Sequence, residues 1–190
     1  MSVPAGSVPL LGFAAYSGTG KTTLLCRLLP VLVRRGLRVA AIKHAHHSFD
    51  IDRPGKDSYE LRKAGACRMV VASRNRRALV EETPGGPEPR LADLLEGLRK
   101  DDLDLVLVEG FKHERFPKIE LHRPSLGRPL LFPEDESILA VATDADLPAE
   151  TALPVLPLND PEAIAAFVAA YVADGGLPAP TGDLAGRVGT

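Results

Sequence analysis

The chain has 190 residues, a formal net charge of −2 at pH 7 and two cysteines. This length suits one α/β domain with a buried core, and the near-neutral charge argues against nucleic acid as the main partner. No apolar run approaches the roughly 20 residues of a membrane helix. Residues 1–7 lack the basic start of a secretory signal, so we expect a cytoplasmic protein with no membrane partner, in which Cys26 and Cys67 are small core residues.

A phosphate-binding loop near the N-terminus is the most informative feature of the chain. An apolar run over residues 8–14 predicts a buried strand, and the leucine-rich residues 24–29 predict a helix. Between them stands the sequence AYSGTGKTT, residues 15–23, in which Ala15 replaces the usual first glycine of the motif. The simpler alternative is a glycine-rich turn that only caps a helix, but the strand–loop–helix order favours phosphate binding.

Each residue type in this loop has an expected role. Gly18 and Gly20 let the backbone curl, so that successive N–H groups and the helix N-terminus face phosphate oxygens. Lys21 should reach the β- and γ-phosphates, and the Thr22 hydroxyl should coordinate Mg²⁺. The expected nucleotide contacts of the loop are Tyr16, Ser17, Gly18, Thr19, Gly20, Lys21, Thr22 and Thr23.

Strand-like and helix-like segments alternate along the rest of the chain. This order predicts an α/β fold of the P-loop NTPase type, a mostly parallel sheet with helices on both faces and some antiparallel strands. After the first helix we expect a strand over 37–43, a helix over 57–64, strands over 68–73 and 78–81 that could form a hairpin, a helix over 91–98, strands over 103–110, 118–122 and 138–142, an apolar run over 155–158, and a helix over 161–173 capped by Asn159 or Asp160.

Acidic side chains at strand ends are the expected metal ligands. Glu109 ends a strongly apolar strand, the place where ligands bind in open α/β sheets, so it is expected to hold Mg²⁺ directly or through water. A polar segment, residues 43–58, leaves the end of the second strand. In it, Asp50 or Asp52 could complete the metal shell.

Basic side chains of the same segment could act at the γ-phosphate. Lys43, Arg53 or Lys56 could neutralise charge there. We expect the segment to order around a bound nucleotide. A transition-metal site is the competing hypothesis, because imidazole suits Zn or Ni. It would use His44, His46 and His47, although no cysteine cluster accompanies them.

Recognition of the base is open at the level of sequence. The Asn/Thr-Lys-x-Asp signature of familiar GTPases is absent. Asp144 and Asp146 follow one predicted strand, and Asn159 and Asp160 follow the next. A carboxylate can accept hydrogen bonds from guanine, and Asp144 is the first candidate. Equally, all four are ordinary turn or cap residues.

Four stretches carry a resemblance to a known family: FAAYSGTGKTTLL (13–25), IKHAHH (42–47), DRPGKDSYELRKAGA (52–66) and LVLVEGFKHE (105–114). With them the chain resembles the molybdopterin-guanine dinucleotide biosynthesis adapter proteins. The resemblance implies a homodimer that binds GTP and hydrolyses it weakly. It also implies a role beside a guanylyltransferase that joins GMP to molybdopterin or to its molybdenum form. We therefore expect an N-terminal tail over residues 1–7, a P-loop GTP-binding domain over 8–173 and a disordered tail over 174–190.

Two other functions compete with an adapter that uses GTP and Mg²⁺. A small-molecule kinase could use the same loop, with positive charge from Arg74, Arg76 and Arg77, but nothing in the sequence marks an acceptor site. A GTP-driven metal-insertion chaperone could use the histidines. No catalytic residue can be named, and the chain contains no glutamine to position water as Ras-like enzymes do, so any hydrolysis should be slow.

Overall fold

The computed structural model describes residues 8–45, 49–98 and 102–176, and these residues form two units. The larger unit draws on Met1–His44 and Leu91–Thr190, and the smaller unit on Ala45–Arg90. The two predicted tails lie outside the described residues, apart from the first three residues of segment 174–190. The domain boundaries expected at residues 8 and 173 stay predictions.

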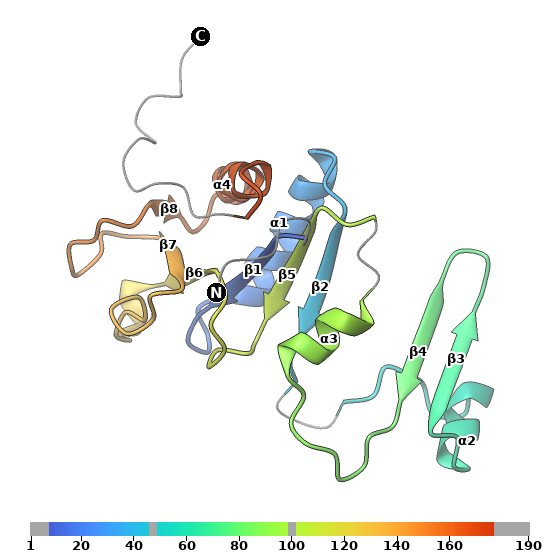
Figure 1. The fold of residues 1–190 in the computed structure, drawn as a ribbon. Coiled ribbons are helices and arrows are strands. Elements are labelled where there is room, and N and C mark those ends of the chain that lie inside the picture. The colour runs from blue at the N-terminus through green and yellow to red at the C-terminus, as the bar shows by residue number, and fades with distance from the viewer. Residues whose placement is uncertain (1–7, 46–48, 99–101, 177–190) are drawn as a thin grey trace. The chain divides into compact units, whose positions relative to one another are not determined.

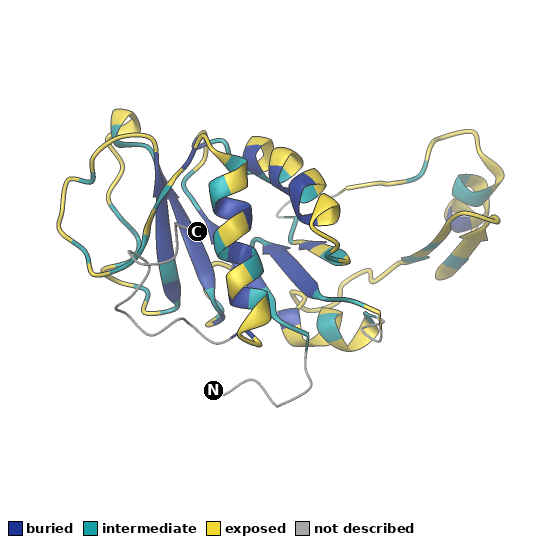
Figure 2. Ribbon diagram, turned by 90° about the horizontal axis from the view of Figure 1, so that it is seen from above, coloured by how far each residue is buried: buried dark blue, intermediate teal, exposed yellow. Residues whose placement is uncertain are grey.

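A six-stranded parallel sheet forms the centre of the larger unit (Figure 1). Its four inner strands are buried, as Figure 2 shows in dark blue, which is typical of a parallel sheet covered on both faces, whereas the two edge strands are largely intermediate or exposed. In spatial order the strands are β2 (Val39–Lys43), β5 (Leu105–Glu109), β1 (Leu10–Ala14), β6 (Lys118–His122), β7 (Ile138–Thr143) and β8 (Val155–Pro157).

Three helices of the larger unit are α1 (Lys21–Arg34), α3 (Leu91–Gly97) and α4 (Pro161–Ala173). Alternate residues of β5 enter two different core clusters, because side chains of a strand alternate between its faces. Leu105 and Leu107 pack with α1 and α4, whereas Val106 and Val108 pack with α3. Helices therefore cover both faces, and the predicted fold class is confirmed.

The smaller unit contains α2 (Asp57–Lys63) and an antiparallel hairpin of β3 (Arg68–Ala72) and β4 (Arg77–Glu81). The register places Val70 opposite Leu79, and both side chains are exposed. The hairpin expected from the sequence is confirmed, and it supplies the antiparallel strands of the fold.

The expectation that both cysteines are core residues is wrong, since Cys26 and Cys67 are free and exposed. On α1, Cys26 lies two residues from each of the buried Leu24 and Leu28. A spacing of two residues puts a side chain on the opposite side of a helix. Cys67 lies just before β3, in a unit with few buried residues.

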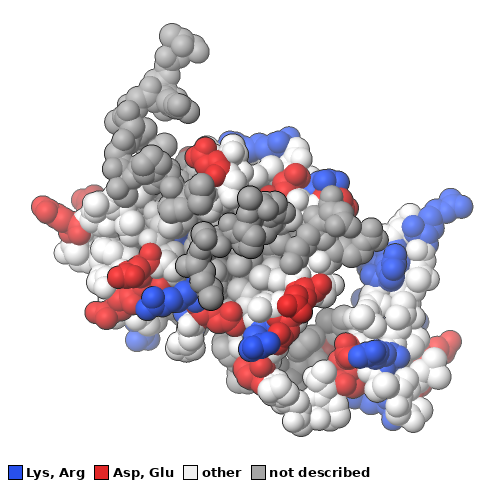
Figure 3. Space-filling view, viewed as in Figure 1, with Lys and Arg blue, Asp and Glu red and all other residues white. Residues whose placement is uncertain are grey.

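The face drawn in Figure 3 shows no large field of one charge among the described residues. Acidic and basic side chains are interspersed on that face. Among the described helices, none has both the length and the apolar character needed to cross a membrane.

Strand β6 carries a buried lysine that ties the segment after the strand to the sheet. The Lys118 side chain is 3% exposed, and its Nζ donates to the Glu114 carbonyl at 2.7 Å, to Asp135 Oδ2 at 3.0 Å and to Ser137 Oγ at 2.9 Å. Buried charges persist in proteins when they are paired and hydrogen-bonded in this way. Burial opposes ionisation of Asp135, but hydrogen bonds from Ser137 and Lys118 outweigh it and lower the pKa of that carboxyl.

A second buried charge on β6, Glu120, binds the same segment. Its carboxylate accepts hydrogen bonds from the backbone N–H groups of Leu131 at 2.8 Å and Phe132 at 2.9 Å. Burial raises the pKa of Glu120 above its ordinary value. The segment between β6 and β7, which begins with the short 3₁₀ helix Pro124–Leu126, is thus held by polar contacts from the strand.

The Lys118–Asp135 pair predicts a specific stability change. Asp135→Asn should lower the free energy of unfolding by about 2–4 kcal/mol at pH 7, because it leaves the buried ammonium without its counter-charge. Glu136→Gln, which removes an exposed neighbouring charge, is the matched control and should change it by less than about 0.5 kcal/mol. Chemical denaturation measures the free energy of unfolding of both variants. If Asp135→Asn were as stable as Glu136→Gln, the Lys118–Asp135 pair would not stabilise the fold.

The same pair has a defined pH dependence. A carboxyl whose folded-state pKa is lowered stabilises the fold above its ordinary pKa of about 3.9, and this stabilisation is lost as the pH falls through the folded-state value. The stability difference between wild type and Asp135→Asn should therefore narrow below about pH 4. A difference that stays constant from pH 7 to pH 3 would show that the charge of Asp135 is not the cause.

Candidate functional site

The loop between β1 and α1 has the backbone conformation that a phosphate loop needs. Gly18 has a φ of +85° and Gly20 a φ of +95°, values that side chains with a Cβ rarely adopt. Thr19 between them is buried, and its hydroxyl donates to the Tyr16 carbonyl at 2.8 Å. The turn is therefore held in shape by its own residues.

The N-terminus of α1 is left available for an anion. Its N-cap, Gly20, has no side chain to accept the first helical N–H groups, and the first turn contains no acidic residue. The positive end of the helix dipole and these N–H groups are thus uncompensated, which favours a bound phosphate. Lys21 is half-buried and Thr22 and Thr23 are exposed, so all three side chains begin at this end of the helix and are accessible to a ligand.

Two further predicted residues lie at the same edge of the sheet. Lys43 ends β2 and Glu109 ends β5, and the register pairs them directly, with Glu109 also opposite Phe13 of β1. Lys43 Nζ lies 3.6 Å from Glu109 Oε2. Glu109 is 20% exposed at its side chain and can still accept a metal. The Thr22 hydroxyl and the Glu109 carboxylate are hard oxygen donors of the type that Mg²⁺ prefers, so the donor set fits this ion.

Gly110 explains why Glu109 can take this position. Its φ is +103°, and a Cβ there would lie 2.5 Å from the Cβ of His44. The His44 N–H donates to the Glu109 carbonyl at 2.8 Å, and the His44 ring stacks on Phe111 with centroids 4.6 Å apart. Only glycine allows β2 and β5 to end this close together.

A pocket of about 180 Å³ lies beside the phosphate loop. This volume is below that of a typical whole-ligand site, so the pocket can take part of a nucleotide while the rest lies along the loop. Its lining residues come from the loop, from α1, from the residue that follows β6 and from the segment between β8 and the start of α4: Gly18, Thr19, Gly20, Thr23, Leu24, Arg27, Arg123, Leu158, Asn159 and Pro161.

The four candidate base-reading residues have different surroundings. Asp160 caps α4, because its side chain accepts from the backbone N–H groups of Glu162 and Ala163, so the cap expected there is confirmed. Asn159 lines the pocket, and Asp144 pairs with Arg123, which also lines it. Asp146 is exposed and is not among the pocket residues.

The sequence interpretation missed Arg27 and Arg123. Arg27 follows Thr23 by four residues on α1, so both lie on the side of the helix that faces the pocket. Arg123 directly follows β6, the neighbour of β1 in the sheet. The rule that ligands bind at the carboxyl ends of parallel strands, applied to every strand rather than to Glu109 alone, is the signal that could have found it.

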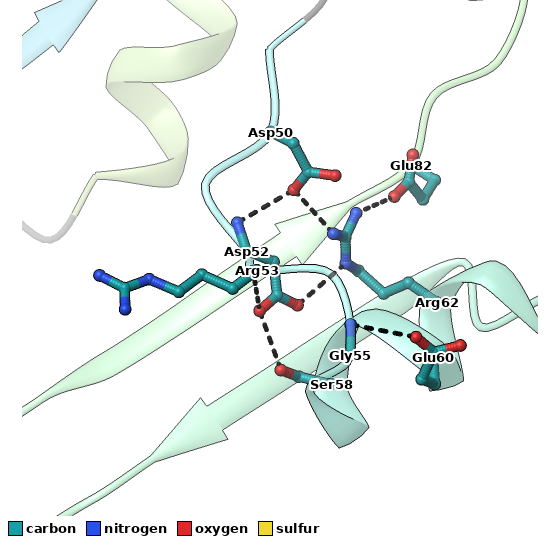
Figure 4. A network of polar contacts seen from close by, with 8 residues as sticks. All are labelled: Asp50, Asp52, Arg53, Gly55, Ser58, Glu60, Arg62 and Glu82. Carbon is teal, nitrogen blue, oxygen red and sulfur yellow. Dashed lines mark hydrogen bonds and ion pairs between the residues drawn. The ribbon is translucent and has the colours of Figure 1, made fainter.

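The predicted residues of the smaller unit form a network of their own (Figure 4). The Arg62 side chain is 4% exposed and is bound by Asp50 Oδ1 at 2.8 Å and Glu82 Oε1 at 2.5 Å, with Asp52 Oδ2 3.5 Å away. The backbone N–H of Asp52 and the charge of Arg62 lower the pKa of Asp50 despite some burial. Any Mg²⁺ at Asp50 would have to share the carboxylate with Arg62.

The remaining expectations for this segment stay predictions. Arg53, Lys56 and Asp50 belong to the smaller unit. The role of the two basic residues at the γ-phosphate and that of Asp50 as a metal ligand stay predictions. Within the described part of the chain, no group of three His, Cys, Asp or Glu side chains is placed to hold a metal. His46 and His47 of the transition-metal hypothesis lie outside the described residues.

Comparison with known proteins gives one consistent result. A family model described as molybdopterin guanine dinucleotide synthesis protein B matches residues 10–144. The molybdopterin-guanine dinucleotide biosynthesis adapter protein of Escherichia coli (strain K12) is 52% identical over 166 residues, 87% of this chain and 94% of that protein. The adapter protein of the same name from Haemophilus influenzae is 45% identical over 163 residues, 85% of this chain and 88% of that protein. A crystal structure of a molybdopterin-guanine biosynthesis protein B aligns with a TM-score of 0.68 at 28% identity, over 86% of this chain and 99% of that one.

The geometry of the loop predicts the effect of removing its lysine. Lys21→Ala should weaken binding of GTP by about 10- to 100-fold, because it removes a charge-assisted contact to the phosphates. The fold should stay intact, since the side chain is not part of either core cluster. Titration with a fluorescent GTP analogue measures the affinity, and Lys112→Ala, at an exposed lysine of the same unit, is the matched control. Unchanged affinity in Lys21→Ala would show that the loop does not hold the phosphates.

Proposed function

The chain belongs to the molybdopterin guanine dinucleotide synthesis protein B family, and on this premise we propose that it binds GTP with Mg²⁺ and acts as an adapter in the synthesis of that dinucleotide. The observation that carries the proposal is the loop at Gly18 and Gly20, which opens onto an uncapped helix beside a pocket. The relatives that are 52% and 45% identical to this chain over the aligned residues are named as adapters of this pathway.

The proposed binding mode follows from the residues at the edge of the sheet. Backbone N–H groups of the loop and the start of α1 donate to phosphate oxygens, and Lys21 adds a positive charge at the β- and γ-phosphates. The Thr22 hydroxyl and Glu109 would hold Mg²⁺, and a metal ion in such a site neutralises the charge of the phosphates to which it binds. Lys43 adds a second cation next to Glu109.

An adapter explains this site better than a fast enzyme does. Fast hydrolysis of GTP needs a residue that orients the attacking water and a cation at the transition state. The chain offers cations but no glutamine. We therefore propose that binding of GTP, rather than its turnover, is the useful output, and that any intrinsic hydrolysis is slow.

We also propose a partner protein, an oligomeric state and a cellular location for this chain. The partner is the guanylyltransferase that joins GMP to molybdopterin or to its molybdenum form. A homodimer is proposed because the β3–β4 hairpin exposes apolar side chains, among them Val70, Val71 and Leu79, that a second copy could cover. A cytoplasmic location is supported by Cys26 and Cys67, which are free and exposed as in proteins of reducing compartments.

No feature of the described residues specifically favours the small-molecule kinase or the metal-insertion chaperone. A kinase needs an acceptor site, and the pocket beside the loop has the size of part of a nucleotide. A metal-insertion chaperone needs a ligand cluster. Among the described histidines, His44 stacks on Phe111 within the edge of the sheet.

Reconstitution of the pathway step tests the proposed function. Adding the protein to the guanylyltransferase with GTP, Mg²⁺ and molybdopterin should raise the yield of the guanine dinucleotide, whereas the protein without the transferase should make little. Lys21→Ala should lose the stimulation and Lys112→Ala should keep it, because only the first variant impairs the phosphate loop.

Two results would overturn this assignment. One is stimulation by Lys21→Ala equal to that of the wild type, which would separate the adapter role from the nucleotide site. The other is fast turnover of GTP by the isolated protein. GTPases stimulated by an activating protein turn over GTP at about 5–20 s⁻¹, and a rate of this order would make the protein an independent enzyme.

A further inference from the structure

Arg123 connects three segments that are far apart in the sequence. Its Nε donates to the carbonyl of Thr19 in the phosphate loop at 2.8 Å. Its Nη1 pairs with Asp144 after β7, and its Nη2 donates to Asn159 Oδ1, after β8, at 3.2 Å. A Cβ at Gly20 would lie 3.8 Å from Nη2, so the guanidinium lies along the loop itself.

Only an arginine can hold this arrangement. The planar guanidinium presents five N–H donors in a rigid fork, whereas the ammonium of a lysine is a single point charge on a flexible stem. The Arg123 side chain is 28% exposed and that of Asp144 is 23% exposed, so the pair is partly shielded from water. Arg123 therefore ties the phosphate loop to the segments that carry Asp144 and Asn159.

The contact with Arg123 also determines how the Asn159 amide is oriented. Arginine has donors and no acceptor, so the amide atom that faces it must be the oxygen. The Nδ2 group of Asn159 is then the part left to bind a ligand, and among the described residues no acceptor takes it. Asn159 lines the pocket beside the loop. The exposed Asn159 thus presents a hydrogen-bond donor at the pocket, oriented by the contact of its Oδ1 with Arg123.

We propose that Arg123 is the positioning residue for base selectivity, because it fixes Asn159 so that Nδ2 donates to the 6-oxo oxygen of guanine. A purine with an acceptor at position 6 fits this donor, and adenine, whose 6-amino group is itself a donor, does not. Asp144 anchors Arg123 in this arrangement instead of reading the base. The inference rests on the proposed binding of GTP and names the residues that select its base.

Nucleotide titrations of matched variants test the inference. Wild-type protein should bind GTP and ITP, which share the 6-oxo group, about tenfold or more tightly than ATP, because a donor that faces another donor stays unpaired. Arg123→Lys should bind all three within about threefold of one another, since it keeps the charge but loses the fork. Its affinity for inorganic tripolyphosphate should stay near that of the wild type. Arg115→Lys, at an exposed arginine, is the control and should keep the wild-type preference.

A second variant separates positioning from simple structural support. Asn159→Asp replaces the donor by an acceptor, so it should reverse the preference and bind ATP at least as tightly as GTP. Retention of the wild-type preference in Arg123→Lys or in Asn159→Asp would overturn the inference and leave the proposed binding of GTP standing. Equal loss of all nucleotides and of tripolyphosphate in Arg123→Lys would also overturn it, because the role would be structural only. Equal binding of GTP, ITP and ATP by the wild type would overturn the inference alone, whereas failure of the wild type to bind GTP at all would overturn the proposed function.

Discussion

The uncompensated start of α1 is the constraint on which the candidate site depends. Gly18 and Gly20 adopt left-handed backbone conformations, and the chain therefore enters the helix with no side-chain cap and no acidic residue in the first turn. A helix of 14 residues concentrates a partial positive charge at such an end, and its first N–H groups need acceptors. A bound phosphate would supply them. The loop makes sense as a structure that is completed by an anion.

The parallel sheet brings the other groups to the same place. Because β1, β2, β5, β6 and β7 run in one direction, their carboxyl ends share one edge, and the residues that follow each strand meet there. Lys43 and Glu109 pair at one side of the phosphate loop. Arg123 joins Asp144 and Asn159 to the loop at the other side. The topology thus separates a metal and phosphate side from a side that can take the base.

Local patterns in the sequence predicted the elements well, because each depends on neighbouring residues. The apolar run of β5, the hairpin of β3 and β4 and the cap at Asp160 all agree with expectation. The family resemblance is confirmed as well. Long-range polar contacts were not predictable in the same way. Arg62 donates to Asp50, 12 residues away in the sequence, and Arg123 donates to the carbonyl of Thr19, 104 residues away. The exposure of Cys26 was misjudged because residue type was weighed above position on the helix, and that of Cys67 because its unit has few buried residues.

A crystal structure with a non-hydrolysable GTP analogue and Mg²⁺ would show whether the loop after β1 holds the nucleotide. We expect the β-phosphate among the N–H groups of the loop from Gly18 to Thr22, with Lys21 on the β- and γ-phosphate oxygens. Mg²⁺ should be bound by the Thr22 hydroxyl, with Glu109 as a direct or water-mediated ligand, and the base should lie against Asn159. A nucleotide bound away from this loop, or one whose phosphates make no contact with Lys21, would contradict this binding mode.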